Sequence, residues 1–376
     1  MRALGIALLG AAVTLVVIAS PSFAASVGPS ATWESGVSAV FTMTNSPVIN
    51  EIVAYERSST GSLTWVANFS TGGLGTGASL ADQGSLAITA NHEWLLAVDA
   101  GSNQVSVLRV GQTDGVPTLT LADVVESGGI LPVSIAIHDE WVYVLNDGNS
   151  ISPGNIAGFS LNSTGQLNPL AGSTQALSTS AATGAAQISF NPAGSLLVVT
   201  EKATSLIDVF AVDSHGVARA ATVHASHGST PYGFAFTPHG QLVVSEAASG
   251  SLSSYRVRDN GYFHVISGSI TDFQTAPCWV VITPGGGYAY TTNAVSNTIS
   301  SYTVGGGGRL HLLQAVAAAT AAGPTDMALT GGGQFLYVRD SGSGQLEGFE
   351  IQPNGTLSWI ETTGTLPSGD EGLVAI

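Results

Sequence analysis

Two stretches of the sequence decide the fold: TPYGFAFTPHGQLVVSEAASGSLSSYRV at residues 230–257 and APCWVVITPGGGYAYTTNAVSNTISSYTV at residues 276–304. In both, a short apolar strand leads through a Pro-x-Gly turn into a second apolar strand, which ends at Glu246 or Asn293. A third strand with alternating polarity follows. Because the second stretch is a near copy of the first, the sequence indicates a fold assembled from one repeated unit.

The same unit opens at seven places in the chain. Its first strands are QGSLAI at 83, PVSIAI at 132, AAQISF at 185, PYGFAF at 231, PCWVVI at 277, PTDMAL at 324 and EGLVAI at 371. A glycine turn and a fourth strand complete each unit, and the alanine-rich LLQAVAAATAAG falls where one fourth strand is expected. Four short antiparallel strands that return every 46 to 53 residues are typical of a β-propeller blade.

The two ends of the chain complete the count of blades. The last unit stops after one strand, EGLVAI, whereas the first unit, VSAVFTMTN onward, lacks an inner strand. If the C-terminal strand completes the N-terminal blade, two open sheet edges disappear. We therefore predict an all-β, seven-bladed propeller as one domain over residues 37–376. Two β-sandwich domains would need a linker and a break in the repeat, and the sequence has neither.

The N-terminus has the pattern of a secretory signal peptide. Arg2 precedes the apolar run ALGIALLGAAVTLVVIA, and small residues end at Ala24. We expect cleavage after residue 24, a Ser/Gly/Pro leader at 25–36, and a secreted, extracellular or periplasmic protein. An uncleaved membrane anchor is the alternative, because the apolar run approaches spanning length.

Composition narrows the possible partners. The chain has 9 basic and 25 acidic residues, a net charge of −16, so it should repel nucleic acids and anionic lipids. We expect no nucleic-acid partner, no membrane partner after signal cleavage, and a monomer. The single cysteine, Cys278, excludes an internal disulfide framework.

One set of polar residues recurs at the end of every second strand: Asn45, Asp99, Asn146, Glu201, Glu246, Asn293 and Asp340. Amide and carboxylate groups around one channel mouth could bind a divalent cation or act as an acid and base. Alternatively, such side chains cap the following turn. Because Glu caps turns less well than Asp or Asn, Glu201 and Glu246 are the predicted catalytic members. A calcium site among Asn146, Glu201, Glu246 and Asn293 is a further hypothesis.

Other candidates come from the loops and strands that open on the same face. His227, in the loop before the fifth unit, is the histidine predicted to take part in catalysis. Trp279 could stack on a sugar or lactone ring, or act as a wedge between blades. Together with Asn293, Asp326 and Asp340 it forms the predicted substrate-binding set. A Cys278 nucleophile beside His227 is the less favoured alternative to a buried, packed Cys278.

The repeated turn, the V-T/S-N/E strand ending and the S-x-x-x-Y/F-x-V third strand resemble the seven-bladed lactonase family across residues 37–376. The resemblance implies lactone hydrolysis, of which 6-phosphogluconolactone hydrolysis is the best-known example. It also implies Gly-Pro-Arg-His on one inner strand, where this chain has Gly184-Ala185-Ala186-Gln187. A phosphosugar site needs several Lys or Arg groups, and Lys202 is the only lysine. We therefore do not expect a phosphogluconolactonase in the strict sense.

Two functions from different classes remain open at this point. The first is a hydrolase of a neutral lactone or carbohydrate-derived ester, with Glu201 or Glu246 as general base and a bound calcium ion as a variant. The second is a non-catalytic extracellular scaffold that recognises a glycan or a protein, which the loss of the Arg-His pair favours. An electron-transfer or quinone-binding propeller is disfavoured, because the sequence has no haem motif.

Overall fold

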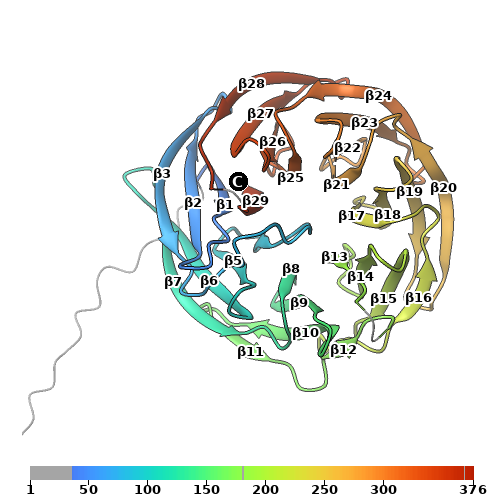
Figure 1. Cartoon of the computed structure of the whole chain (residues 1–376), viewed down its shortest axis with the longest axis horizontal. Coiled ribbons are helices and arrows are strands. Elements are labelled where there is room, and N and C mark those ends of the chain that lie inside the picture. The colour runs from blue at the N-terminus through green and yellow to red at the C-terminus, as the bar shows by residue number, and fades with distance from the viewer. Residues whose placement is uncertain (1–35, 180–181, 368) are drawn as a thin grey trace, which may run out of the picture. The chain divides into compact units, whose positions relative to one another are not determined.

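The computed structural model describes residues 36–179, 182–367 and 369–376. The predicted signal peptide, and all of the predicted leader except Gly36, lie outside these residues. The described chain folds into seven antiparallel sheets arranged in a ring, as Figure 1 shows. The predicted seven-bladed propeller is therefore confirmed. Among the described residues no helix is long and apolar enough to cross a membrane.

The innermost strand of each blade borders the central channel. In order around the ring, these are β29 (Glu371–Ala375), β4 (Leu86–Ile88), β8 (Pro132–His138), β13 (Ala185–Phe190), β17 (Pro231–Phe236), β21 (Pro277–Ile282) and β25 (Pro324–Leu329). Most of these strands have a register irregularity near their first residues, for example between Pro231 and Phe234. An extra residue of this kind turns a side chain out of the sheet.

The second and third strands form the packed middle of each blade. The second strands are β1 (Ala39–Met43), β5 (Trp94–Asp99), β9 (Trp141–Gly148), β14 (Leu196–Glu201), β18 (Gln241–Glu246), β22 (Tyr288–Asn293) and β26 (Phe335–Asp340). The third strands are β2 (Glu51–Arg57), β6 (Gln104–Thr113), β10 (Pro153–Leu161), β15 (Leu206–Ala211), β19 (Ser251–Val257), β23 (Thr298–Val304) and β27 (Gln345–Ile351). Their side chains are buried because both faces of each sheet pack against neighbouring blades.

The outermost strands are less buried and face solvent on one side. They are β3 (Leu63–Ser70), β7 (Val116–Glu126), β16 (Thr222–Ala225), β20 (Phe263–Thr271), β24 (Leu310–Ala319) and β28 (Leu357–Thr363). In the third blade two short segments, β11 (Leu167–Pro169) and β12 (Gln175–Ala176), both pair with β10. The alanine-rich segment is β24, as the repeat predicts.

The C-terminal strand closes the ring. β29 pairs antiparallel with β1, so that Val40 lies opposite Ala375 and Phe41 opposite Val374. Ala39 and Ile376 exchange two backbone hydrogen bonds, at 3.1 and 2.8 Å. In Figure 1 the red C-terminal strand lies beside the blue N-terminal blade. The predicted closure is confirmed, and neither end leaves an open edge.

One inner strand starts later than the repeat predicts. The second unit should begin at Gln83, but β4 begins at Leu86. Residues 78–85, here called the channel segment, run through the middle of the ring instead. The Gln83 side chain exchanges hydrogen bonds with both backbone groups of Val280, at 3.1 and 3.0 Å. The Gln83 backbone contacts Ala186 and Ser134, so this segment links three blades.

Candidate functional site

The seven polar residues at the second-strand ends are all buried, each with 0% of its surface exposed. Several of them bind loops beside their own blades, whereas Asn293 donates to Thr298 and Ser300 on the adjacent third strand. Asp99, for example, accepts hydrogen bonds from Thr71 and Asn50 at 2.6 and 2.9 Å, and from Ser106. Asn146 donates to the carbonyl of Ser127 at 3.2 Å. Anchoring of loop groups by amide and carboxylate side chains accounts for these contacts without a ligand.

Glu201 is held in the same way. It accepts hydrogen bonds from Ser178 and Thr204 at 2.5 and 2.6 Å. Burial, together with the nearby carboxyl group of Glu201, raises the pKa of Asp208 on the neighbouring third strand to about 8. Asp208 is therefore mostly protonated at neutral pH. Glu201 and Glu246 lie in separate blades and each is bonded within its own surroundings.

Asp340 forms a similar pair in the seventh blade. Burial and the neighbouring Glu347 raise the pKa of Asp340 to about 9. Glu347 also accepts hydrogen bonds from the Ala321 amide and the Thr362 hydroxyl, at 3.0 and 3.2 Å. Asp340 lies opposite Pro324 in the pairing of β26 with β25, the strand that also carries Asp326.

Glu246 and His227, two of the predicted catalytic residues, meet around a serine. Ser269 Oγ donates to Glu246 Oε2 at 2.8 Å, and His227 Nδ1 lies 3.0 Å from Ser269 Oγ. Glu246 is buried, whereas His227 is exposed on the face where the inner strands begin. This group of three residues, here called the serine cluster, combines a hydroxyl, an imidazole open to solvent and a buried carboxylate.

Local backbone geometry creates the serine cluster. The pairing of β19 with β20 shifts register between Leu252 and Ser254, and Ser269 adopts a left-handed conformation with a φ of 44°. This conformation is costly for a residue other than glycine. A Cβ atom on Gly268 would lie only 2.5 Å from the His227 ring. The glycine therefore lets the imidazole approach the strand.

Trp279 and Asp326 lie near the channel axis, in a different polar cluster. Trp279 is 2% exposed, and its Nε1 donates to the carbonyl of Asp82 at 2.6 Å. This hydrogen bond joins Trp279 to the channel segment. Asp326 is 3% exposed, accepts from the Met327 amide at 2.7 Å, and has its pKa raised to about 7 by burial.

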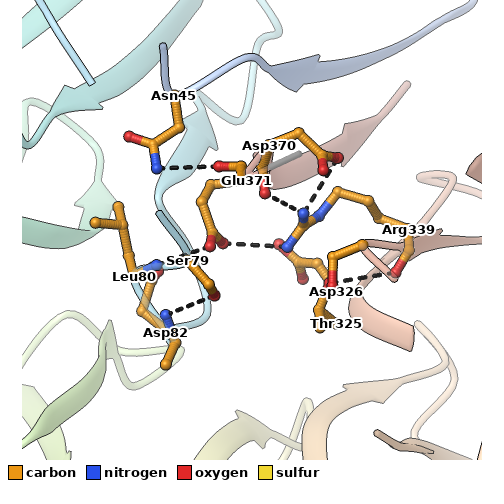
Figure 2. A network of polar contacts seen from close by, with 12 residues as sticks. Asn45, Ser79, Leu80, Asp82, Thr325, Asp326, Arg339, Asp370 and Glu371 are labelled. Carbon is orange, nitrogen blue, oxygen red and sulfur yellow. Dashed lines mark hydrogen bonds and ion pairs between the residues drawn. The ribbon is translucent and has the colours of Figure 1, made fainter. Parts of the chain in front are cut away.

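Figure 2 shows the centre of this axial cluster, where Arg339 bridges two blades. Its guanidinium lies 3.1 Å from Asp370 and 3.1 Å from Glu371, and all three side chains are buried. Glu371 also accepts a hydrogen bond from the Leu80 amide at 2.8 Å. These contacts join β26, the C-terminal strand and the channel segment, so the cluster holds the closed ring together.

Lys202 and Asp82 complete the axial cluster. Burial lowers the pKa of Lys202 and raises that of Asp82, and the ammonium lies 4.9 Å from the centre of the Tyr232 ring. Lys202 donates to the carbonyls of Ala81 and Ala185. Burial raises the pKa of each of the cluster's four acids, namely Asp82, Asp326, Asp370 and Glu371. Bound protons can therefore balance the charge.

The four residues of the predicted calcium site do not form a common ligand set. Asn146, Glu201, Glu246 and Asn293 come from four blades and are hydrogen-bonded within their own surroundings. In the described part of the chain no three His, Cys, Asp or Glu side chains form a group that could hold a metal ion. Calcium therefore stays a prediction from sequence.

The position where the family resemblance implies an Arg-His pair lines the channel. Ala186 is buried, and Gln187 accepts a hydrogen bond from the Phe234 amide at 2.6 Å. Gln83 and Gln187 border a cavity of about 470 Å³ whose other walls include Phe190, Phe236 and Ile282. Two neutral amides thus border this cavity, whose lining residues include no cation and no titratable base.

Sequence reasoning missed Ser269 and most of the axial cluster. Ser269 lies in the polar run SGSIT and gives no signal of its own, because its contact with His227 depends on the strand irregularity. Arg339 could have been suspected, since a charge inside the apolar strand FLYVR requires a buried partner. Lys202, the chain's only lysine, carries a weaker signal of the same kind.

Comparison with solved structures identifies similar propellers. A candidate 6-phosphogluconolactonase from Bacteroides fragilis is 18% identical, with a TM-score of 0.70 over 93% of this chain and 100% of the other. The periplasmic gluconolactonase of Pseudomonas aeruginosa is 17% identical, with a TM-score of 0.71 over 90% and 99% of the two chains. At these identities the likeness shows the fold.

Comparison with curated protein sequences gives no match. The family model described as lactonase, 7-bladed β-propeller, matches residues 153–271 and 263–370, which together span more than half of the chain. The match includes the blade of the serine cluster and the blade of Arg339. With the seven closed blades, it shows that the chain belongs to the seven-bladed β-propeller lactonase family.

Proposed function

We propose that the protein hydrolyses a neutral lactone or carbohydrate-derived ester, with Ser269 as the nucleophile and His227 as the general base. The observation that carries the proposal is the 3.0 Å contact between His227 Nδ1 and Ser269 Oγ. A hydroxyl within hydrogen-bond reach of an imidazole is the arrangement that nucleophilic acyl transfer requires. His227 is also exposed, so a substrate can reach the pair from solvent.

The residues support a complete reaction. Ser269 Oγ attacks the lactone carbonyl while its proton passes to His227 Nδ1. The ring C–O bond then breaks, and the leaving oxygen takes that proton from His227. Water, deprotonated by His227, hydrolyses the resulting ester on Ser269 and releases a hydroxy acid. The Ser269 hydroxyl donates to Glu246 Oε2 in the structure, so it turns from Glu246 to an unprotonated His227 Nδ1 before its proton is transferred.

The charge of the protein favours a neutral substrate. The net charge is −16, and Glu246 is the charged group nearest to Ser269 in its hydrogen-bond network. An anionic substrate would be repelled, and no Lys or Arg in the described part of the chain hydrogen-bonds a member of the serine cluster. We therefore expect the protein to hydrolyse 6-phosphogluconolactone more slowly than neutral lactones.

The proposal is tested by initial rates on glucono-1,5-lactone, an uncharged aliphatic lactone and 6-phosphogluconolactone. Ser269→Gly removes the hydroxyl and suits the left-handed backbone, and should lower kcat about 10³-fold. His227→Gln should lower it about 10²-fold. The control is His264→Gln, which changes an exposed histidine on the same outer strand and should alter the rate less than about twofold.

Three results would contradict the proposal. They are a wild-type rate no higher than buffer on all three substrates, an unchanged rate in folded Ser269→Gly, or a preference for the phosphorylated lactone. Thermal unfolding of each variant shows whether a loss of rate reflects chemistry or folding.

A further inference from the structure

A groove separate from both polar clusters lies between the first and seventh blades. It has a volume of about 570 Å³. β2 and β3 form one side, and the segment after β28 forms the other. Its lining residues are Val53, Tyr55, Trp65, Asn68 and residues 363–367. A volume of this size is within the range of small-molecule sites.

Trp65 presents a fixed aromatic face at this groove. Trp65 is 60% exposed to solvent, although the side chains of tryptophan residues are usually buried to a greater extent. Trp65 Nε1 donates to Asn68 Oδ1 at 3.3 Å, and Asn68 Nδ2 donates to Glu51 at 3.2 Å. These two contacts orient the ring while leaving it open to solvent.

Tyr55 places an unpaired hydroxyl at the floor of the groove. The residue is 2% exposed, yet its hydroxyl has no hydrogen-bond partner in the described part of the chain. Tyr302, at the same place on the third strand of the sixth blade, donates to the carbonyl of Ile270 at 3.2 Å. The Tyr55 hydroxyl is not among the fully covered polar atoms that lack a partner, so a ligand in the groove can reach it. Burial raises the pKa of Tyr55 to about 12, which keeps it a neutral donor.

Gly364 keeps this hydroxyl accessible. A Cβ atom at this position would lie 2.8 Å from the Tyr55 hydroxyl oxygen, and the glycine has a φ of 91°. On either side of it, the hydroxyls of Thr363 and Thr365 also have no hydrogen-bond partner among the described residues. The groove thus combines one aromatic face with three unpaired hydroxyls and no charged lining residue.

We propose that this groove binds a neutral saccharide, with one sugar ring stacked on Trp65 and its hydroxyls bonded to Tyr55, Thr363 and Thr365. A sugar ring offers an apolar C–H face for the indole and donors and acceptors for the hydroxyls. The uncharged lining favours a neutral sugar over a uronate, sulfated or phosphorylated one. The site is independent of the serine cluster, which lies in the fifth blade.

The test is a titration with cellotetraose, maltotetraose, chitotetraose and a sulfated tetrasaccharide, each to 10 mM, followed by calorimetry and tryptophan fluorescence. At least one neutral tetrasaccharide should saturate with a Kd of about 1 mM. Trp65→Ala should weaken binding at least tenfold, and Tyr55→Phe about three- to tenfold. Trp359→Ala is the matched control, since Trp359 is 61% exposed on the outer strand β28 but does not line the groove.

Lactone hydrolysis should be unchanged in Trp65→Ala, so failure of this proposal is distinguishable from failure of the proposed function. Binding of none of the neutral tetrasaccharides, tighter binding of the sulfated one, or equal weakening by Trp65→Ala and Trp359→Ala would each overturn the inference.

Discussion

Asp340 shows how a single buried acid links stability to pH. Its pKa is raised from 3.8 to about 9 in the folded protein, because burial and Glu347 disfavour the charged form. The folded state therefore binds a proton that the unfolded state releases between these values. Its contribution to stability is complete below pH 3.8 and is lost as the pH rises toward 9.

Asp340→Asn should remove this dependence. Asparagine fits the position, because Asn146 and Asn293 occupy it in other blades. We expect the variant to match the wild type at pH 4.5 and to exceed its free energy of unfolding by about 1–3 kcal/mol at pH 8.5. Urea unfolding at the two pH values measures the difference. An equal effect at both values, or a loss at pH 8.5 alone, would show that Asp340 is ionised in the folded protein.

Individual site residues are predictable from the sequence only in part. The repeat aligns Glu201, Glu246 and Asp340 correctly at strand ends, because strand ends follow from periodicity. Whether such a side chain turns toward the channel mouth or toward its own loop depends on donors such as Ser178, which lie more than twenty residues away. The Ser269–His227 contact spans 42 positions and has no sequence signature.

The channel segment is the element that departs most from the repeat. Its residue Gln83 contacts the sixth blade and does not extend the inner strand of the second blade, so β4 has only three residues. Hydrophobic periodicity cannot reveal this, because the pattern QGSLAI is the same whether its first residues pair in a sheet or cross the channel. Tertiary hydrogen bonds decide between the two.

Gln83→Ala should therefore destabilise the protein more than Gln187→Ala, although both side chains border the same cavity. Gln83 satisfies both the amide and the carbonyl of Val280, whereas Gln187 satisfies the amide of Phe234. We expect losses of about 2–3 and about 1 kcal/mol respectively, measured by urea unfolding at pH 7. Equal losses would mean that the Gln83 side chain does not hold the segment in place.

For the ring as a whole, fold and closure follow from the sequence because seven similar units must each bury two faces. A period of 46 to 53 residues, with an incomplete unit at each end, leaves closure as the arrangement without open edges. The axial cluster is different, because Asp82, Lys202, Arg339 and Glu371 become neighbours only after the ring has closed. The Arg339–Glu371 ion pair and the raised pKa of Asp82 depend on assembly and not on local pattern.

The proposed hydrolysis depends on Ser269, which carries the acyl group between its two steps. Its most direct test is labelling of the folded protein with a fluorophosphonate, followed by peptide mass spectrometry. We expect one modified residue, Ser269, with labelling lost in Ser269→Gly, slowed at least tenfold in His227→Gln and unchanged in His264→Gln. Continued lactone hydrolysis by protein that is unlabelled at Ser269, or labelled at another residue, would contradict it.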